Sequence, residues 1–181
     1  MKEEIIIAGF GGQGVLSMGK ILAYGGIMQD QEVSWLPSYG PEMRGGTCNV
    51  SVILSDNKIS SPILSRFDTA IILNQQSMDK FEKQVKPGGL LIYDTNGITR
   101  HPERKDITIC RLDAAEEAAK MGNAKAYNMV VLGAYLKMKP VVTMENVLRG
   151  LKKSLPPRHH NLIPMNEQAI TVGMNAVVKV Q

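Results

Sequence analysis

The sequence predicts an α/β protein with three layers: a largely parallel, Rossmann-like sheet with helices on both faces, followed by a helical C-terminal part. Three observations support this prediction. Short apolar runs of strand length alternate with amphipathic helical segments. A glycine-rich turn joins the first such run directly to a helix. The 181 residues are 44% hydrophobic and 21% charged, which suits one α/β domain spanning residues 1–181.

Hydrophobic periodicity places the elements of the first half. The apolar run from Glu4 to Gly9 predicts a strand covered on both faces, and a helix from Val15 to Gln29 follows the glycines. Glu32 to Leu36 predicts a second strand that ends at Pro37. Alternating polar and apolar residues from Thr47 to Leu54 predict a strand near a sheet edge or in an antiparallel pair.

The second half continues this pattern and then becomes helical. Strands are predicted at Thr69 to Leu73, Leu90 to Tyr93 and Ile107 to Leu112. An amphipathic helix over Gln75 to Val85 separates the first two, and Pro87-Gly88 ends it. After the last strand we expect only helices: Ala114 to Met121, Lys125 to Met138, Met144 to Leu155, and one from about Asn166.

Two of these helices are too apolar for the outer layer of a free monomer. Val15 to Gln29 carries a small-residue face of Gly19, Ala23 and Gly26, which another backbone could approach closely. Lys125 to Met138 has hardly any polar side. A helix that is apolar all round is buried in a large core or against another chain. We therefore expect this chain to be a subunit of an assembly.

Composition and cysteine spacing exclude several classes. The net charge of +4 is mild, and the basic clusters Lys152-Lys153 and Arg158-His159-His160 are small, so we expect no nucleic-acid partner. No apolar stretch approaches the ~20 residues that span a bilayer, so we expect no membrane partner. Cys48 and Cys110 lie far apart without neighbouring ligands, which predicts core thiols, a cytoplasmic location and no metal site.

The first motif with chemical potential is Gly9-Phe10-Gly11-Gly12-Gln13-Gly14, between a buried strand and a helix. Glycines allow a tight turn there, and free N–H groups at a helix start favour an anion. Dinucleotide folds share this pattern, but Asp30 precedes the second strand and no acid stands at the strand's end. Three interpretations stay open: an NAD(P) or FAD site, a purely structural turn, and a site for another anionic or polar group shared with a partner.

The second motif is the loop Ser38-Tyr39-Gly40-Pro41-Glu42-Met43-Arg44-Gly45-Gly46. Such a glycine-rich loop is costly to order unless something docks there. Glu42 and Arg44 suit a carboxylate, a phosphate or a partner loop, although they could also form an internal ion pair. Elsewhere no nucleophile stands beside a base, and the Gly-Asp-Gly motif typical of thiamine diphosphate enzymes is missing. We therefore expect no catalytic residue in this chain.

Together, in this order, the two loops resemble the gamma subunit of the 2-oxoacid:ferredoxin oxidoreductases. That family combines G-x-G-G-Q-G with a later Y-G-x-E-x-R-G-G loop, matched here by Gly9 to Gly14 and Tyr39 to Gly46. The strand that follows, Cys48 to Val52, and the tail Asn166-Glu167-Gln168-Ala169 also fit. The stretch Trp35 to Gly46 is most similar to the 2-oxoglutarate branch, and the pyruvate and ketoisovalerate types share much of it.

The resemblance implies a gamma subunit that is inactive alone. Its complex would oxidatively decarboxylate a 2-oxoacid, in this branch 2-oxoglutarate, with coenzyme A as substrate, giving acyl-CoA, CO₂ and reduced ferredoxin. The implied partners are alpha and beta subunits, in some types a ferredoxin-like delta subunit, and ferredoxin as electron acceptor, in a hetero-oligomer. Thiamine diphosphate, Mg²⁺ and the iron–sulfur cluster would belong to partner subunits, with no cofactor bound by this chain alone.

Both loops are expected beyond the strand ends on one side of the sheet, facing partner chains near the route of coenzyme A. The amides of Gly11 to Gly14 would form an anion nest, and Arg44 would meet a phosphate or a carboxylate. Two alternatives remain: a stand-alone NAD(P)-dependent oxidoreductase, and a non-catalytic scaffold subunit. The residues expected to bind are Gly9, Gly11, Gly12, Gln13, Gly14, Tyr39, Glu42, Arg44, Gly45 and Gly46.

Overall fold

The computed structural model describes residues 1–40 and 46–181. Within them the strands are β1 (Lys2–Phe10), β2 (Glu32–Tyr39), β3 (Thr47–Ser55), β4 (Phe67–Ile72), β5 (Val85–Asp94), β6 (Thr108–Leu112) and β7 (Val178–Lys179). The α-helices are α1 (Val15–Met28), α2 (Gln75–Phe81), α3 (Ala114–Lys120), α4 (Tyr127–Met138), α5 (Met144–Ser154) and α6 (Ile163–Ala176). Short 3₁₀ segments are η1 (Glu82–Gln84), η2 (Ala124–Ala126) and η3 (Pro157–Leu162).

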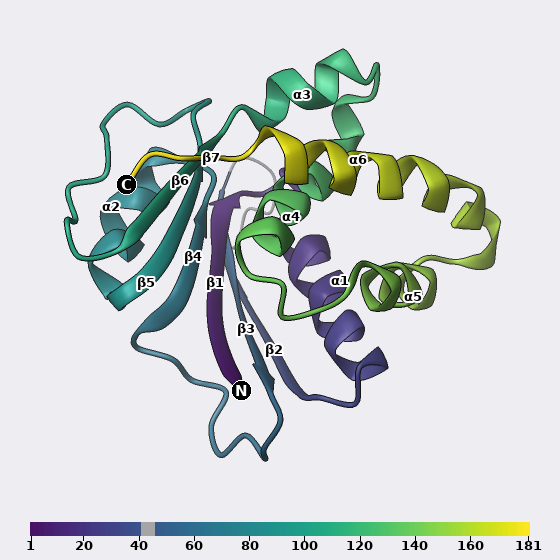
Figure 1. Cartoon of the computed structure of the whole chain (residues 1–181), viewed down its shortest axis with the longest axis horizontal. Helices are drawn as coiled ribbons and strands as arrows, with labels where there is room; N and C mark the ends of the chain where they lie inside the picture. The colour runs from purple at the N-terminus through teal and green to yellow at the C-terminus, as the bar shows by residue number, and fades with distance from the viewer. Residues whose placement is uncertain (41–45) are drawn as a thin grey trace.

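All the strands belong to one sheet, in the order β2-β3-β1-β4-β5-β6-β7 (Figure 1). β1, β4, β5 and β6 are mutually parallel. β3 is antiparallel to both β1 and β2, so β2 runs in the same direction as β1. The predicted largely parallel sheet and the predicted antiparallel pairing of the strand from Thr47 are therefore confirmed.

Four predictions of where elements lie were wrong. β2 continues through Pro37 to Tyr39, because an edge strand leaves one row of backbone groups unpaired and can accommodate proline. The helix predicted over Gln75 to Val85 ends at Phe81, and β5 already begins at Val85 and runs through Pro87-Gly88.

The fourth wrong prediction is that only helices follow the strand at Ile107 to Leu112, because β7 follows the C-terminal helix. Its two residues pair antiparallel with Cys110 and Arg111 of β6. A strand this short has no periodicity of its own, and its pairing with β6 determines it.

The two faces of the sheet carry separate hydrophobic cores. Ile5 and Ile7 of β1 face the larger core, which includes α1, α3 and α4. Ile6 and Ala8 face a smaller core that includes Met78 of α2. Successive strand residues alternate between faces, so the continuous apolar run of β1 serves both cores. Helices on both faces were predicted, and this is confirmed, although α2 is the only α-helix of the described chain in the smaller core.

A second tier of helices covers α4. α4 has almost no polar side, and its residues 129–136 are all buried. α6 crosses α4 so closely that a Cβ on Gly133 would lie 1.9 Å from the Ile170 carbonyl oxygen, and one on Gly173 would lie 1.8 Å from that of Val130. Figure 1 shows α6 beyond α4, farther from the sheet.

A close helix crossing at a glycine also covers α1. A Cβ on Gly150 of α5 would lie 2.6 Å from the backbone nitrogen of Gly25. The small face predicted to receive another chain instead meets β3: Gly19 lies against Val50 and Gly26 against Leu54. The C-terminal helices of the same chain thus cover both apolar helices, so these helices do not by themselves indicate a partner chain.

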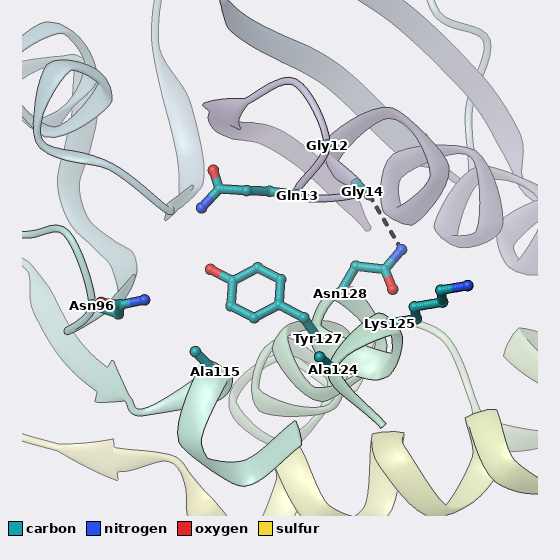
Figure 2. A pocket seen from close by; sticks show the side chains of 9 residues that line it. All are labelled: Gly12, Gln13, Gly14, Asn96, Ala115, Ala124, Lys125, Tyr127 and Asn128. Atoms are coloured by element: carbon teal, nitrogen blue, oxygen red, sulfur yellow. Dashed lines mark hydrogen bonds between the residues drawn. The ribbon is translucent and has the colours of Figure 1, made fainter. Parts of the chain in front are cut away.

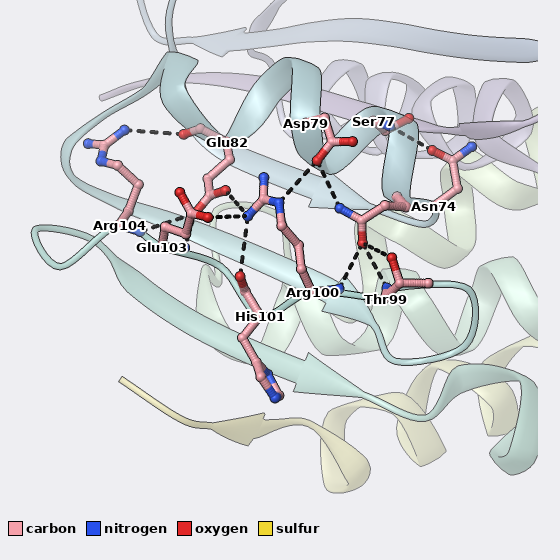
Figure 3. Close-up of polar contacts among 10 residues, drawn as sticks. Asn74, Ser77, Asp79, Glu82, Thr99, Arg100, His101, Glu103 and Arg104 are labelled. Atoms are coloured by element: carbon pink, nitrogen blue, oxygen red, sulfur yellow. Dashed lines mark hydrogen bonds and ion pairs between the residues drawn. The ribbon is translucent and has the colours of Figure 1, made fainter.

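A long crossover without a helix joins β5 to β6, and side chains of α2 and η1 hold it in place (Figure 3). The buried Glu82 carboxylate accepts a hydrogen bond from Arg100 Nη1 at 2.8 Å and one from the backbone N–H of Arg104 at 3.1 Å. Gln75 Oε1 accepts from the backbone N–H groups of Thr99 and Arg100. The loop is thus tied down by hydrogen bonds, in part to the buried Glu82 carboxylate, instead of by helix packing.

In residues 1–40 and 46–181, no helix has both the length and the hydropathy to cross a membrane.

Candidate functional site

A crevice opens at the carboxyl ends of the central parallel strands. β1 and β4 are neighbours, but the chain leaves β1 towards β2 at one edge and leaves β4 towards β5 on the other side. Open α/β sheets bind ligands outside the carboxyl ends of strands at such a switch point. The crevice has a volume of about 390 Å³ and is lined by Gly12, Gln13, Gly14, Asn96, Ala115, Ala124, Lys125, Tyr127 and Asn128 (Figure 2).

The glycine loop forms one wall, and its glycines are required by the turn itself. Gly12 and Gly14 have φ angles of 97° and 75°, which side-chain-bearing residues rarely adopt. A Cβ on Gly14 would also lie 2.5 Å from Nδ2 of Asn128. That amide nitrogen donates to the Gly14 carbonyl oxygen at 3.4 Å. Gly14 is the N-cap of α1 and has no side chain to cap it, so the first N–H groups of the helix point towards this end of the sheet.

Gln13 has a structural role of its own. Its Oε1 accepts from the Phe10 backbone N–H at 2.6 Å, and its Nε2 donates to the Leu73 carbonyl oxygen at 3.3 Å. A Cβ on Gly9 would lie 2.4 Å from Gln13 Oε1, so Gly9 makes room for this amide. Gln13 therefore closes the glycine turn and links the ends of β1 and β4, and a ligand role for it remains a prediction.

The opposite wall rests on a buried carboxylate. Asp94, the last residue of β5, is 2% exposed. Its Oδ2 accepts from the Tyr127 hydroxyl at 2.7 Å, and its Oδ1 accepts from the Ala114 backbone N–H at 3.1 Å. Burial raises the pKa of the Asp94 carboxyl, and these hydrogen bonds oppose the rise. Asp94 thus ties the starts of α3 and α4 to the end of the sheet.

Tyr127 presents its ring to the crevice. Burial and the neighbouring Asp94 raise the pKa of Tyr127, so its hydroxyl stays protonated. The hydroxyl donates a hydrogen bond to Asp94. In Figure 2 the ring lies among Gln13, Asn96 and Ala115. Tyr127 is therefore a wall of the site and not a candidate base.

The second predicted loop meets the glycine loop at this edge. The backbone N–H of Gly11 donates to the Gly46 carbonyl oxygen at 2.8 Å, and Tyr39 pairs with Cys48 at the end of β2. Tyr39 is 55% exposed. The expected placement of both loops on one side of the sheet is thus confirmed for Tyr39 and Gly46. The predicted binding residues Glu42, Arg44 and Gly45 lie outside the described residues.

Sequence reasoning missed the wall of the crevice that faces the glycine loop. Asn96, Lys125, Tyr127 and Asn128 were not singled out, because no motif connects them to the glycine loop. The available signal was positional, since Asp94 and Asn96 directly follow a predicted buried strand, where parallel sheets place functional groups.

The lining favours binding over proton transfer. Among the described lining residues, Lys125 is the one cation and none is a carboxylate. Lys125 is exposed and has no ion-pair partner in residues 1–40 and 46–181. Together with the amides of Asn96 and Asn128 and the start of α1, it suits an anionic or hydrogen-bond-accepting group. In the same residues, no three His, Cys, Asp or Glu side chains are grouped to hold a metal.

The geometry disfavours a dinucleotide site. A ribose-binding acid belongs at the end of a parallel strand adjacent to β1. On the side of the sheet that carries β2, β1 adjoins the antiparallel β3. The start of β3, and not a strand end, lies at the crevice edge, with Thr47 opposite Phe10. Within the described residues 36–40 and 46–49, which end β2 and begin β3, there is no carboxylate.

Comparison with known proteins decides the family. Residues 4–176 match the family described as pyruvate ferredoxin/flavodoxin oxidoreductase. The chain belongs to this family. The resemblance inferred from the two loops is thereby confirmed at the family level.

Curated relatives of several substrate types match this chain, and two of them show the range of likeness. Ketoisovalerate oxidoreductase subunit VorA of Methanothermobacter thermautotrophicus is 36% identical over 170 residues, covering 94% of this chain and 35% of that protein. 2-Oxoglutarate synthase subunit KorC of Methanocaldococcus jannaschii is 33% identical over 162 residues, covering 86% of this chain and 85% of that protein. The chain thus spans about a third of the VorA relatives but most of KorC.

Solved structures share the fold. The keto/oxoacid ferredoxin oxidoreductase gamma subunit from Geobacter sulfurreducens superimposes with a TM-score of 0.79 at 28% identity, over 96% of each chain. A 2-oxoglutarate:ferredoxin oxidoreductase from Magnetococcus marinus superimposes with a TM-score of 0.85 at 22% identity, over 96% of this chain and 30% of that one. The same fold therefore occurs both as a separate subunit and as part of a longer chain.

Proposed function

We propose that this chain is the gamma subunit of a 2-oxoacid:ferredoxin oxidoreductase complex. The family match over residues 4–176 carries this proposal, and the near full-length likeness to a gamma subunit supports it. The complex oxidatively decarboxylates a 2-oxoacid with coenzyme A to acyl-CoA and CO₂, and passes the electrons to ferredoxin. Thiamine diphosphate, Mg²⁺ and the iron–sulfur clusters belong to alpha, beta and, in some types, delta subunits. The gamma chain is inactive alone.

The favoured substrate is 2-oxoglutarate. The loop from Trp35 to Gly46 is most similar to that branch, and KorC relatives at 33% and 34% identity support the assignment. Ketoisovalerate is the competing substrate, since VorA is slightly more identical. Steady-state reduction of a viologen dye by the purified complex, with 2-oxoglutarate, 3-methyl-2-oxobutanoate and pyruvate in parallel, distinguishes them. The highest kcat/KM for either of the other acids would refute the 2-oxoglutarate assignment.

The crevice at the carboxyl edge of the sheet faces the partner chains along the route of coenzyme A. Coenzyme A carries phosphates, and the crevice offers the start of α1, the Lys125 ammonium and the amide of Asn96. With no carboxylate among its described lining residues, this site positions a group that reacts elsewhere. We assign Arg44 to the same anionic group or to a partner carboxylate.

The role of the crevice is tested in the assembled complex. Lys125→Ala and Arg44→Ala should each raise the KM for coenzyme A about tenfold, the effect of one lost charge-assisted hydrogen bond of roughly 1.5 kcal/mol. Lys58→Ala, another exposed lysine, is the matched control. Unchanged KM and unchanged assembly in both variants would contradict this role without affecting the gamma-subunit assignment. A complex that kept its turnover after removal of the gamma chain would instead support a scaffold role.

A further inference from the structure

The net positive charge of the chain is concentrated in one short segment. Residues 146–162 contain Arg149, Lys152, Lys153 and Arg158 and no Asp or Glu. The other 17 of the 21 Lys and Arg side chains balance the 17 Asp and Glu side chains, so this segment accounts for the formal net charge of +4. A local excess of one sign attracts surfaces of the opposite sign.

The fold presents these charges outward from a fixed support. α5 buries Gly150 and Leu151 against α1, where the two helix backbones cross closely at Gly150. Arg149, Lys152 and Lys153 are exposed. Because residues three and four apart share one face of a helix, these three lie together. Figure 1 shows α5 on the outer side of α1, away from the sheet.

The segment after α5 folds back and extends this surface. Nε2 of His160 lies 3.0 Å from the carbonyl oxygens of both Lys152 and Leu155, which holds η3 against the last turn of α5. Arg158 is exposed and its Nε donates to Nε2 of His159 at 3.2 Å. We call the resulting surface the basic patch, defined as Arg149, Lys152, Lys153, Arg158 and His159.

The cations of the basic patch are unpaired, in contrast to others in the molecule. Lys86, Arg100 and Arg104 each contact carboxylates. Within residues 1–40 and 46–181, no member of the patch forms an ion pair. Cations in the last turn of a helix interact favourably with the helix dipole, which explains why Lys152 and Lys153 stand there without an ion-pair partner. It does not account for Arg158, which lies beyond the helix.

We propose that the basic patch is an electrostatic docking surface for an acidic face of another subunit of the same oxidoreductase complex. The proposal rests on the proposed function for the existence of that complex. Charge complementarity selects the partner surface: four exposed cations without an ion-pair partner favour a surface rich in carboxylates, which would steer and orient the approach of the subunit. The patch lies outside the crevice, so this contact is separate from the one assigned to coenzyme A.

The test uses the tagged full chain and the partner subunits of its own complex. Affinity for the partner subunits is measured by biolayer interferometry over a series of NaCl concentrations. The double variant Lys152→Glu/Lys153→Glu should weaken association about tenfold or more at low salt and flatten its salt dependence. Lys58→Glu/Lys105→Glu introduces the same charge change at two exposed lysines elsewhere and should have little effect.

Thermal unfolding of each variant separates docking from stability. The Tm should fall slightly more for Lys152→Glu/Lys153→Glu, because it places negative charges in the last turn of α5, whereas Lys58 and Lys105 lie in loops. Equal affinity and equal salt dependence in the two double variants would overturn the proposal. So would duplex DNA binding that depends on the patch while subunit affinity stays unchanged. If the unmodified chain recovered no oxidoreductase subunit at all, the proposed function itself would be wrong, which is a different outcome.

Discussion

Replacing Gly133 by alanine tests whether this chain covers its own apolar helix. The new Cβ would lie 1.9 Å from the Ile170 carbonyl oxygen, 2.8 Å from its carbonyl carbon and 3.0 Å from its Cα. All three atoms are backbone atoms of α6, so no side chain can rotate away. α4 and α6 must move apart by more than 1 Å, roughly the gap to ordinary contact distance.

The magnitude follows from two opposing effects. Overpacking a rigid contact costs about 3 kcal/mol, the upper end of the usual range. Alanine recovers about 1 kcal/mol over glycine in helix propensity. The free energy of unfolding should therefore fall by about 2 kcal/mol. At about 2–4 °C per kcal/mol for a chain of this size, the Tm should fall by about 4–8 °C.

The assay is differential scanning calorimetry of the purified chain, with Gly40→Ala as the matched control. Gly40 has no positive φ, and a Cβ placed on it would meet no atom of residues 1–40 and 46–181 within 4 Å, so its replacement should change the Tm by less than about 1 °C. If Gly133→Ala unfolded at the same temperature as the control, α6 would not cover α4. A partner chain would then have to bury the apolar face of α4.

Three further predictions concern buried polar and thiol groups. Glu82→Gln removes the buried charge that Arg100 contacts. The free energy of unfolding in urea should fall by about 2 kcal/mol, and trypsin should cleave within residues 95–106 faster. An unchanged cleavage rate would contradict this. Burial raises the pKa of Asp94, so the wild type should lose stability relative to Asp94→Asn as the pH rises from about 3 to 7; a constant difference would contradict this. Burial also raises the pKa of both Cys48 and Cys110, so a thiol-reactive disulfide reagent at pH 8 should label them only after unfolding; rapid labelling of the native chain would show the cores to be open.

The fold was largely predictable because its strands have strong local signals. The continuous apolar run of β1 and the alternation of β3 each reflect how many faces of the strand are covered. Local signals failed where tertiary contacts decide. Pro37 lies within β2 because that strand is at the sheet edge, and Val178 forms a strand because β6 offers it a pairing partner.

Only one wall of the candidate site was predictable, for a similar reason. The glycine loop is contiguous and adjoins a buried strand, so Gly12 and Gly14 could be found from sequence. Asp94 and Tyr127 come from separate elements that meet only in the folded chain. The apolar helices were not evidence for a partner, because sequence cannot tell whether the covering surface is another chain or, as Gly133 and Gly173 show, a later helix.

The proposed role of this chain, as the gamma subunit of a 2-oxoacid oxidoreductase complex, is tested most directly by its partners. The measurement is an anaerobic purification of the tagged full-length chain from its own cells, followed by thiamine diphosphate assay and viologen reduction. We predict stoichiometric partner subunits that bring thiamine diphosphate, with dye reduction that depends on a 2-oxoacid and on coenzyme A. A chain recovered alone that bound NADH would contradict this role and favour a stand-alone oxidoreductase.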